Sequence, residues 1–174
     1  MTRRFDRDLV VALMSGFIGA LALAVSTYNV YLQHKQVRAA VWPRLLFMPS
    51  FSDDDFHYAL ENGGIGPAEI RSVRVFVDDK PVEDWPAAVE RMTGKKLDEH
   101  WGYSTMSGTL VTAGETRNVF SSRDRAIGTV LFKEQLRLRA QICYCSALED
   151  CWLLEKNVPR PVSRCPEGPD LFHD

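Results

Sequence analysis

The chain has 174 residues and a formal net charge of −2, because 21 basic residues stand against 23 acidic ones. This length accommodates one domain of ordinary size, ~100 to 150 residues, together with an accessory segment. The near balance of charges leaves no basic footprint for a phosphate backbone, so the composition argues against a nucleic-acid partner.

The first part of the chain is apolar enough to cross a membrane. No charged residue occurs from Leu9 to Gln33, and this stretch is longer than the ~20 residues that a helix needs to span the hydrocarbon core. A cleaved signal peptide is the alternative, with Ala22-Leu23-Ala24 as its cleavage motif, but the apolar run is long for a signal sequence. We therefore expect an N-terminal stretch at 1–8, a transmembrane helix at 9–33 and a helical stalk at 34–42.

Basic residues flank both ends of the apolar segment, so the positive-inside rule is nearly balanced. They are Arg3, Arg4, Arg7, Lys35, Arg38 and Arg44. The short N-terminus is the easier part to leave in the cytoplasm, and cysteines clustered near the other end of the chain suit an oxidising compartment. We expect a single-pass protein of a bacterial inner membrane, with a cytoplasmic N-terminus and residues 43–174 in the periplasm.

Small residues recur inside the apolar segment at four-residue spacing, at Ser15 and Gly19 and at Gly16, Ala20 and Ala24. This spacing lets two membrane helices approach closely and could make the chain a homo-oligomer. The simpler interpretation is that small residues are common in such helices. In either case the segment would anchor the chain in the membrane.

Beyond Pro43 the pattern changes to short extended runs separated by turn residues, which is typical of an antiparallel sandwich or barrel. These runs are 44–48, 57–62, 70–79, 108–112, 117–122, 137–146 and 151–156. In the third run, four apolar side chains predict one buried face of a central strand, namely Ile70, Val73, Val75 and Val77. One helical insert is expected at 85–92, with Asp84 as its N-cap and Gly94 near its end.

Two turn sequences carry a resemblance. "ENGGIGPAEIRSVRVFVDDKPV" places a glycine-rich turn before a long strand and an Asp-rich turn after it, and "TLVTAGETRNVF" places Gly-Glu between two further strands. This order resembles the immunoglobulin-like modules of bacterial envelope proteins, which include adhesion-type domains and small membrane-anchored proteins of unknown function. The resemblance covers residues 43–156. It implies a mainly β, immunoglobulin-like antiparallel β-sandwich.

The glycine-rich turn is expected to be structural, and a ligand-binding loop is the alternative. Its glycines allow positive φ, and Asn62 can bond its own backbone. The expected structural turn residues are Asn62, Gly64, Gly66, Pro67 and Gly114.

Four cysteines lie near the end of the chain. Cys143 and Cys145 are two residues apart in an expected strand, so they share one face. The turn "SALED" would place Cys151 opposite Cys145, at a Cα separation of ~4.5 to 5.5 Å that suits a disulfide. Cys143 would then bond Cys165 and hold the Pro-rich tail at 157–174. Other pairings stay open, because four cysteines allow three connectivities.

A Cu(I) site at Cys143 and Cys145 is the alternative, because thiolates suit a soft metal. Cys-x-Cys in such a domain behind an anchor resembles the copper-delivery proteins of cytochrome oxidase. That family has Phe after each cysteine, where this chain has Tyr144 and Ser146. A zinc ribbon is not indicated, because the cysteine spacing lacks its paired C-x₂₋₄-C motifs.

No catalytic motif is found, and no enzyme activity or cofactor is expected. Asp53, Asp54 and Asp55 could bind Ca²⁺ but lack the spacing of an EF-hand, so a solvated loop is favoured. His57 and His100 stand alone, without a Gly-x-Ser-x-Gly motif elsewhere. We expect a binding or assembly module for another envelope component, and copper or thiol-redox handling through the first two cysteines is the alternative.

Overall fold

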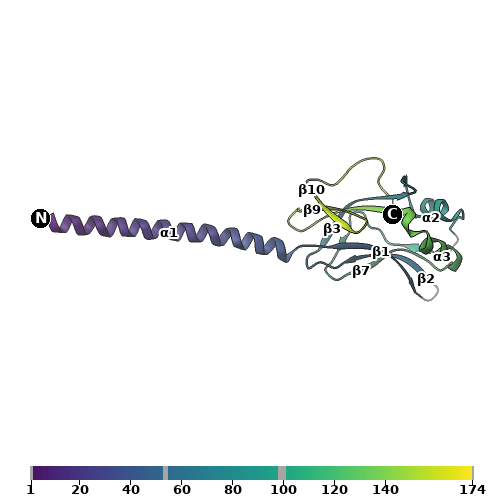
Figure 1. The fold of residues 1–174 in the computed structure, drawn as a ribbon, viewed down its shortest axis with the longest axis horizontal. Helices are drawn as coiled ribbons and strands as arrows, with labels where there is room; N and C mark the ends of the chain where they lie inside the picture. The colour runs from purple at the N-terminus through teal and green to yellow at the C-terminus, as the bar shows by residue number, and fades with distance from the viewer. Residues whose placement is uncertain (1, 53–54, 98–100, 174) are drawn as a thin grey trace. The chain divides into compact units, whose positions relative to one another are not determined.

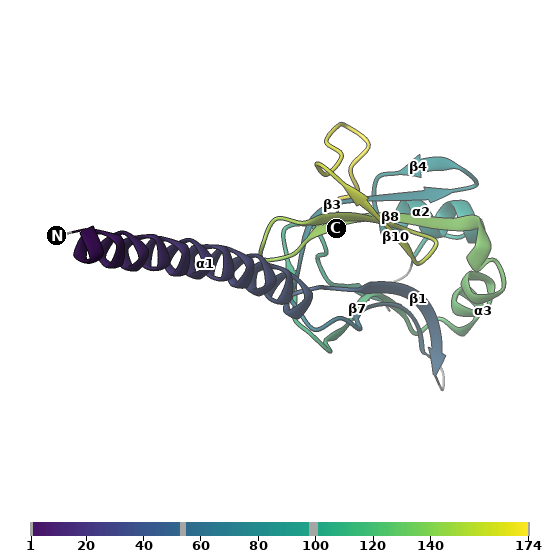
Figure 2. The ribbon, with the colours of Figure 1, turned by 60° about the vertical axis from the view of Figure 1, so that its left-hand side comes forward.

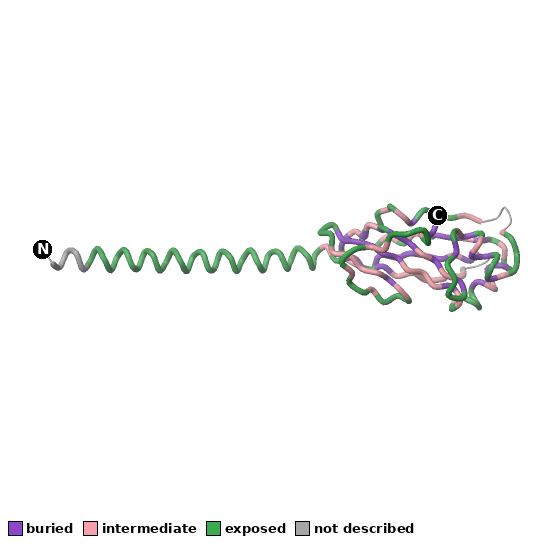
Figure 3. The backbone as a smooth tube through the Cα atoms, turned by 90° about the horizontal axis from the view of Figure 1, so that it is seen from above, coloured by how far each residue is buried: buried purple, intermediate pink, exposed green. Residues whose placement is uncertain are grey.

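The computed structural model describes residues 2–52, 55–97 and 101–173. The chain divides into two units, residues 1–40 and 41–174 (Figure 1). The first unit is one continuous helix, α1 (Thr2–Ala40). Its most apolar stretch has a mean hydropathy of 2.3 and is not buried (Figure 3). By length and composition α1 could therefore cross a membrane.

The second unit is mainly β, with two antiparallel sheets among its described residues that lie face to face (Figure 2). The first sheet has the spatial order β1 (Leu45–Ser52), β2 (Asp55–Asn62), β7 (Thr116–Ser122) and β5 (Trp101–Tyr103). The second has the order β10 (Val158–Val162), β9 (Cys151–Glu155), β8 (Leu138–Cys145), β3 (Ala68–Val77) and β4 (Lys80–Val82), and β6 (Leu110–Val111) also pairs with β3.

Strand β3 shows why one face of each sheet is buried. The four apolar residues expected on its inner face, from Ile70 to Val77, are all buried. Ile70 and Val73 are three residues apart, and they share this face because the pairing of β3 with β8 shifts between Ile70 and Ser72. A β-bulge of this kind adds one residue to a strand and restores the alternation after it.

The predicted helical insert is present as α2 (Trp85–Thr93). The side chain of Asp84 accepts a hydrogen bond from the N–H of Ala87, and Gly94 ends the helix with φ 68°. The expectation of a single insert is wrong, because α3 (Arg125–Lys133) and a 3₁₀ turn (Gln135–Arg137) also interrupt the β pattern. Gly128 lowers the helix propensity of α3, but a Cβ there would lie 2.7 Å from Cβ of Phe56, so close packing requires glycine.

An aromatic cluster fills the core between the sheets. Trp85 from α2 stacks on Tyr58 at 5.6 Å between ring centroids, and lies 4.9 Å from Phe120. Phe172, close to the end of the chain, meets Trp85 edge to face at 5.1 Å. The tail beyond residue 156 is thus part of the domain, since it supplies both strand β10 and a buried ring.

Candidate functional site

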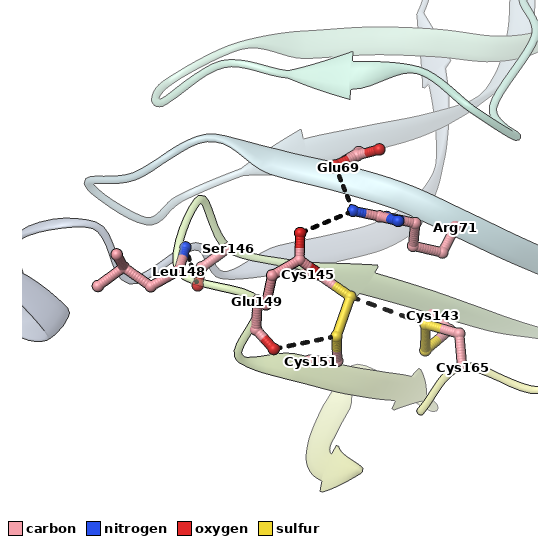
Figure 4. Close-up of a disulfide and its surroundings, with 9 residues drawn as sticks. All are labelled: Glu69, Arg71, Cys143, Cys145, Ser146, Leu148, Glu149, Cys151 and Cys165. Carbon is pink, nitrogen blue, oxygen red and sulfur yellow. Dashed lines mark hydrogen bonds and ion pairs between the residues drawn. A yellow bond between two sulfur atoms is a disulfide. The ribbon is translucent and has the colours of Figure 1, made fainter. Parts of the chain in front are cut away.

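The four cysteines form two disulfides on the outer face of the second sheet (Figure 4). Cys145 faces Cys151 directly in the β8–β9 hairpin and bonds it, with 4.0 Å between their Cα atoms. Cys143 bonds Cys165, with a Cα separation of 5.6 Å. This is the pairing that the sequence favoured. We call these four residues the disulfide cluster.

The two disulfides touch each other. Sγ of Cys145 lies 4.0 Å from Sγ of Cys165 (Figure 4). The sulfur atoms of Cys145, Cys151 and Cys165 all lie within 4.8 Å of one another. The two thiols that the sequence suggested as copper ligands, Cys143 and Cys145, are each bonded to a different partner.

Residues 163–173 form a C-terminal strap that crosses the second sheet. One end is fixed by the disulfide of Cys165 to β8. At the other end the N–H of Phe172 donates to the carbonyl of Val73 at 2.8 Å. The N–H of His173 donates to the carbonyl of Glu83 at 2.7 Å. The strap therefore continues the pairing of β3 between the short strands β6 and β4.

A cavity of about 420 Å³ lies between the strap and the β8–β9 turn. Cys145, Cys151 and Cys165 line it, so it opens directly onto the disulfide cluster. Arg71, which pairs with Glu69 at 2.8 Å and Glu149 at 3.1 Å, lies on its wall (Figure 4).

A second and larger hollow, about 670 Å³, lies between edge strand β1 of the first sheet and strands β8 and β9 of the second. We call it the β1–β8 groove. Its apolar lining comprises Phe47, Pro49, Leu136, Leu138, Ala140 and Leu154. Leu136, in the 3₁₀ turn, is 95% exposed, so an unusually open apolar side chain stands beside an apolar groove.

Both arginines at the rim of the β1–β8 groove are paired with carboxylates, and Lys156 also lines the groove. Arg137 donates to both carboxylate oxygens of Asp78, at 2.8 and 2.6 Å, and these hydrogen bonds hold the pKa of Asp78 below its ordinary value. Arg139 pairs with Glu155, and also with Asp79 at 3.4 Å. The charges at the rim are therefore of both signs, and those of Arg137 and Arg139 are compensated.

Asn157 closes the exposed edge of β1. Lys156 and Asn157 both have positive φ in the β9–β10 turn. The Asn157 side chain accepts the N–H of Phe47 at 2.8 Å and donates to the carbonyl of the same residue at 2.9 Å. One amide thus takes the place that a neighbouring strand would occupy.

The glycine-rich turn has a structural geometry. The buried side chain of Asn62 accepts from the N–H groups of Arg44 and Gly64, and donates to the carbonyls of Gly66 and Val111. Gly64 and Gly66 do not use the positive φ that glycine allows; they are glycine because a Cβ at either would overlap the backbone of residues 41–44. Gly114 does have positive φ, at 74°.

The remaining residues suggested by the sequence are the aspartates 53–55 and two histidines. Asp53, Asp54 and His100 lie outside the described residues. Asp55 is 3.9 Å from Arg123, and His57 is opposite Ser50 on β1 and Ser121 on β7. The sequence did not point to Leu136, Asn157 or Phe172. Of these three, only Asn157 gave a local signal, because asparagine is common in turns.

Comparison with known proteins identifies no relative: no family model, curated protein or solved structure matches this chain.

Proposed function

We propose that this protein is a single-pass membrane protein whose extracytoplasmic domain binds a segment of another envelope protein in the β1–β8 groove. The apolar helix α1 supports the anchor, because large apolar side chains such as Leu13 and Phe17 are 65% exposed and need an apolar environment. Two disulfides support an oxidising compartment, which in a bacterium is the periplasm.

The domain is proposed to be immunoglobulin-like, and its strand order supports this. Strands β1, β2, β3, β4, β5, β7, β8 and β9 can be lettered A, B, C, C′, D, E, F and G in chain order. One sheet then has the order A-B-E-D and the other G-F-C-C′, as in immunoglobulin domains. Such folds serve many functions, so the binding role must be argued from the groove itself.

Two edges of the sandwich are poorly suited to strand addition, which is a common way for sheets to bind peptides. On β1, Asn157 already satisfies the backbone of Phe47, and Pro49 has no N–H to donate. On β10, Pro159 and Pro161 likewise lack donors. Binding near these strands would therefore depend on side chains.

The observation that carries the proposal is the exposed Leu136 beside the apolar lining of the β1–β8 groove. Because both rim arginines are compensated within the domain, an occupant is recognised mainly by its apolar side chains. We infer that the occupant is an extended protein segment that inserts apolar side chains between Phe47 and Leu136.

Site-specific photocrosslinking in intact cells tests this proposal. A photoreactive residue replaces Leu136 in the full-length protein, and Ile65, which is 67% exposed and lies outside the groove, is the matched control position. We expect one discrete protein adduct from position 136 and none of the same mass from position 65.

Ala140→Trp then fills the groove in the protein that carries the crosslinker at position 136. We expect it to reduce the adduct at least tenfold. The proposal is wrong if positions 136 and 65 give the same adducts, or if the Ala140→Trp substitution leaves the adduct yield unchanged while the domain stays folded by circular dichroism.

A further inference from the structure

We propose that the disulfide cluster is a thiol–disulfide exchange site, at which a thiol entering the 420 Å³ cavity makes the two disulfides exchange partners through Cys145 and Cys165. This site is on the outer face of the second sheet, whereas the β1–β8 groove lies between the sheets. Exchange at the disulfide cluster therefore does not depend on binding in the β1–β8 groove.

Burial decides which sulfur atoms a thiol can reach. Cys151 and Cys165 are partly exposed, whereas Cys143 and Cys145 are buried. Access is one of the factors that decide which sulfur of a disulfide is attacked. A thiol in the cavity can reach Cys151 or Cys165, which both line it, and attack on Cys151 makes Cys145 the leaving group.

The leaving group then has a neighbouring target. Sγ of Cys145 lies 4.0 Å from Sγ of Cys165, at van der Waals contact (Figure 4). Cys145 belongs to strand β8, whose backbone fixes its position. A reaction between groups fixed at contact distance has a high effective concentration. An isolated hairpin disulfide would lack this second step.

The bonds and electrons balance in two displacements. First, the incoming thiol gives its proton to water and its thiolate bonds to Sγ of Cys151, the Cys145–Cys151 bond breaks, and Cys145 keeps the electron pair. Next, this thiolate bonds to Sγ of Cys165, the Cys143–Cys165 bond breaks, and Cys143 takes the electron pair and then a proton from water. One thiol enters, one appears at Cys143, and no net oxidation or reduction occurs.

The cavity also indicates the class of substrate. Its charged walls are mixed, with Arg71 and Arg164 opposed by Glu149 and Glu167, so it does not select a strongly charged ligand. Its volume of about 420 Å³ is at the small end for ligand pockets. A small thiol, or one cysteine side chain of a protein, is the substrate that fits.

Mapping where the new thiol appears tests the exchange. The oxidised full-length protein is incubated with reduced glutathione, quenched in acid, alkylated and mapped by mass spectrometry of peptides. In molecules with glutathione on Cys151, we expect the alkyl label on Cys143 and a Cys145–Cys165 disulfide. A label on Cys145 with the Cys143–Cys165 bond intact would overturn the proposal, and so would the absence of any glutathione adduct on the cluster.

The double variant Cys143→Ser/Cys165→Ser is the matched control, because it retains the first disulfide and removes its neighbour. Its label must appear on Cys145. Cys151→Ser gives a second test that needs no added thiol, because it leaves Cys145 free beside Cys165. The exchange predicts a measurable fraction of Cys145–Cys165 in this variant, and finding only Cys143–Cys165 would contradict it.

Repeating the experiment with a reduced cysteine-containing peptide separates the two sources of thiol. A faster reaction with glutathione identifies a small thiol as the substrate, and a faster reaction with the peptide identifies a protein thiol. Failure of both reagents to form an adduct would overturn the proposal.

Discussion

Replacing Phe172 by Ala tests whether the C-terminal strap is part of the core. Phe172 is buried, and its ring meets Trp85 edge to face at 5.1 Å. Truncating a buried Phe to Ala costs about 3 to 5 kcal/mol, of which an aromatic pair accounts for about 0.5 to 1.5 kcal/mol. The irregular backbone of the strap can relax around the shortened side chain, so we expect a loss near the lower limit, about 3 kcal/mol.

The assay is unfolding of the full-length protein by guanidinium chloride in non-ionic detergent, followed by tryptophan fluorescence. Phe132→Ala is the matched control, because Phe132 is 43% exposed on α3 and meets Phe51 edge to face at 6.2 Å. It should cost no more than about 1 kcal/mol. A loss for Phe172→Ala no larger than that of this control would refute the reasoning.

The disulfide of the strap should be coupled to Phe172. Its sequence separation of 22 corresponds to about 3.4 kcal/mol of loop-closure entropy. When Cys143→Ser/Cys165→Ser releases the strap, the contact between Phe172 and Trp85 contributes less to stability, because more conformational entropy is lost in forming it. The triple variant should therefore lose less stability than the sum of the two changes, by about 0.5 kcal/mol or more, and strict additivity would show that the two ends of the strap act independently.

Three further changes have definite expected outcomes. Tyr58→Phe removes a buried hydroxyl that has no hydrogen-bond partner among the described residues, so thermal unfolding should show unchanged or higher stability, and a clear fall in Tm would contradict this. Gly128→Ala brings a methyl group 2.7 Å from Cβ of Phe56. It should lower the free energy of unfolding by about 1 to 3 kcal/mol, although Ala has a higher helix propensity than Gly. A higher Tm in the same assay would show that the contact relaxes. The hydrogen bond from the N–H of Thr112 is the largest cause that lowers the pKa of Glu115 to about 2. This stabilisation is present above the unfolded pKa of ~4.3 and is lost as the pH falls towards 2. The unsubstituted protein should therefore lose more stability on acidification than the Glu115→Gln variant. Parallel profiles of stability against pH for the two proteins would contradict this prediction.

Local geometry explains which parts of the structure could be predicted. The inner face of β3 follows from alternation, and the partner of Cys145 follows from a hairpin with a five-residue turn. The N-cap of α2 needs only Asp84 at the right position. Each of these features depends on residues close together in sequence, so the printed pattern contains most of the relevant information.

The features that were missed depend on contacts between distant residues. α3 forms although Gly128 disfavours a helix, because its packing on Phe56 needs that glycine. Phe172 follows a Pro-rich stretch that resembles a loose tail, and only the position of Trp85 gives it a buried site. The β1–β8 groove requires the relative placement of two sheets, which no single segment specifies.

Strand β8 separates the two proposed sites, so that their tests can be interpreted independently. Leu138 and Ala140, near its start, face the β1–β8 groove, whereas Cys143 and Cys145, near its end, carry the disulfides on the outer face. Alternate residues of a strand point to opposite faces, and β8 is held between β3 and β9. Ala140→Trp should therefore leave the glutathione reaction unchanged, and Cys151→Ser should leave the crosslink from position 136 unchanged. If either substitution altered both readouts, the two sites would be coupled through β8 and could not be regarded as separate functions.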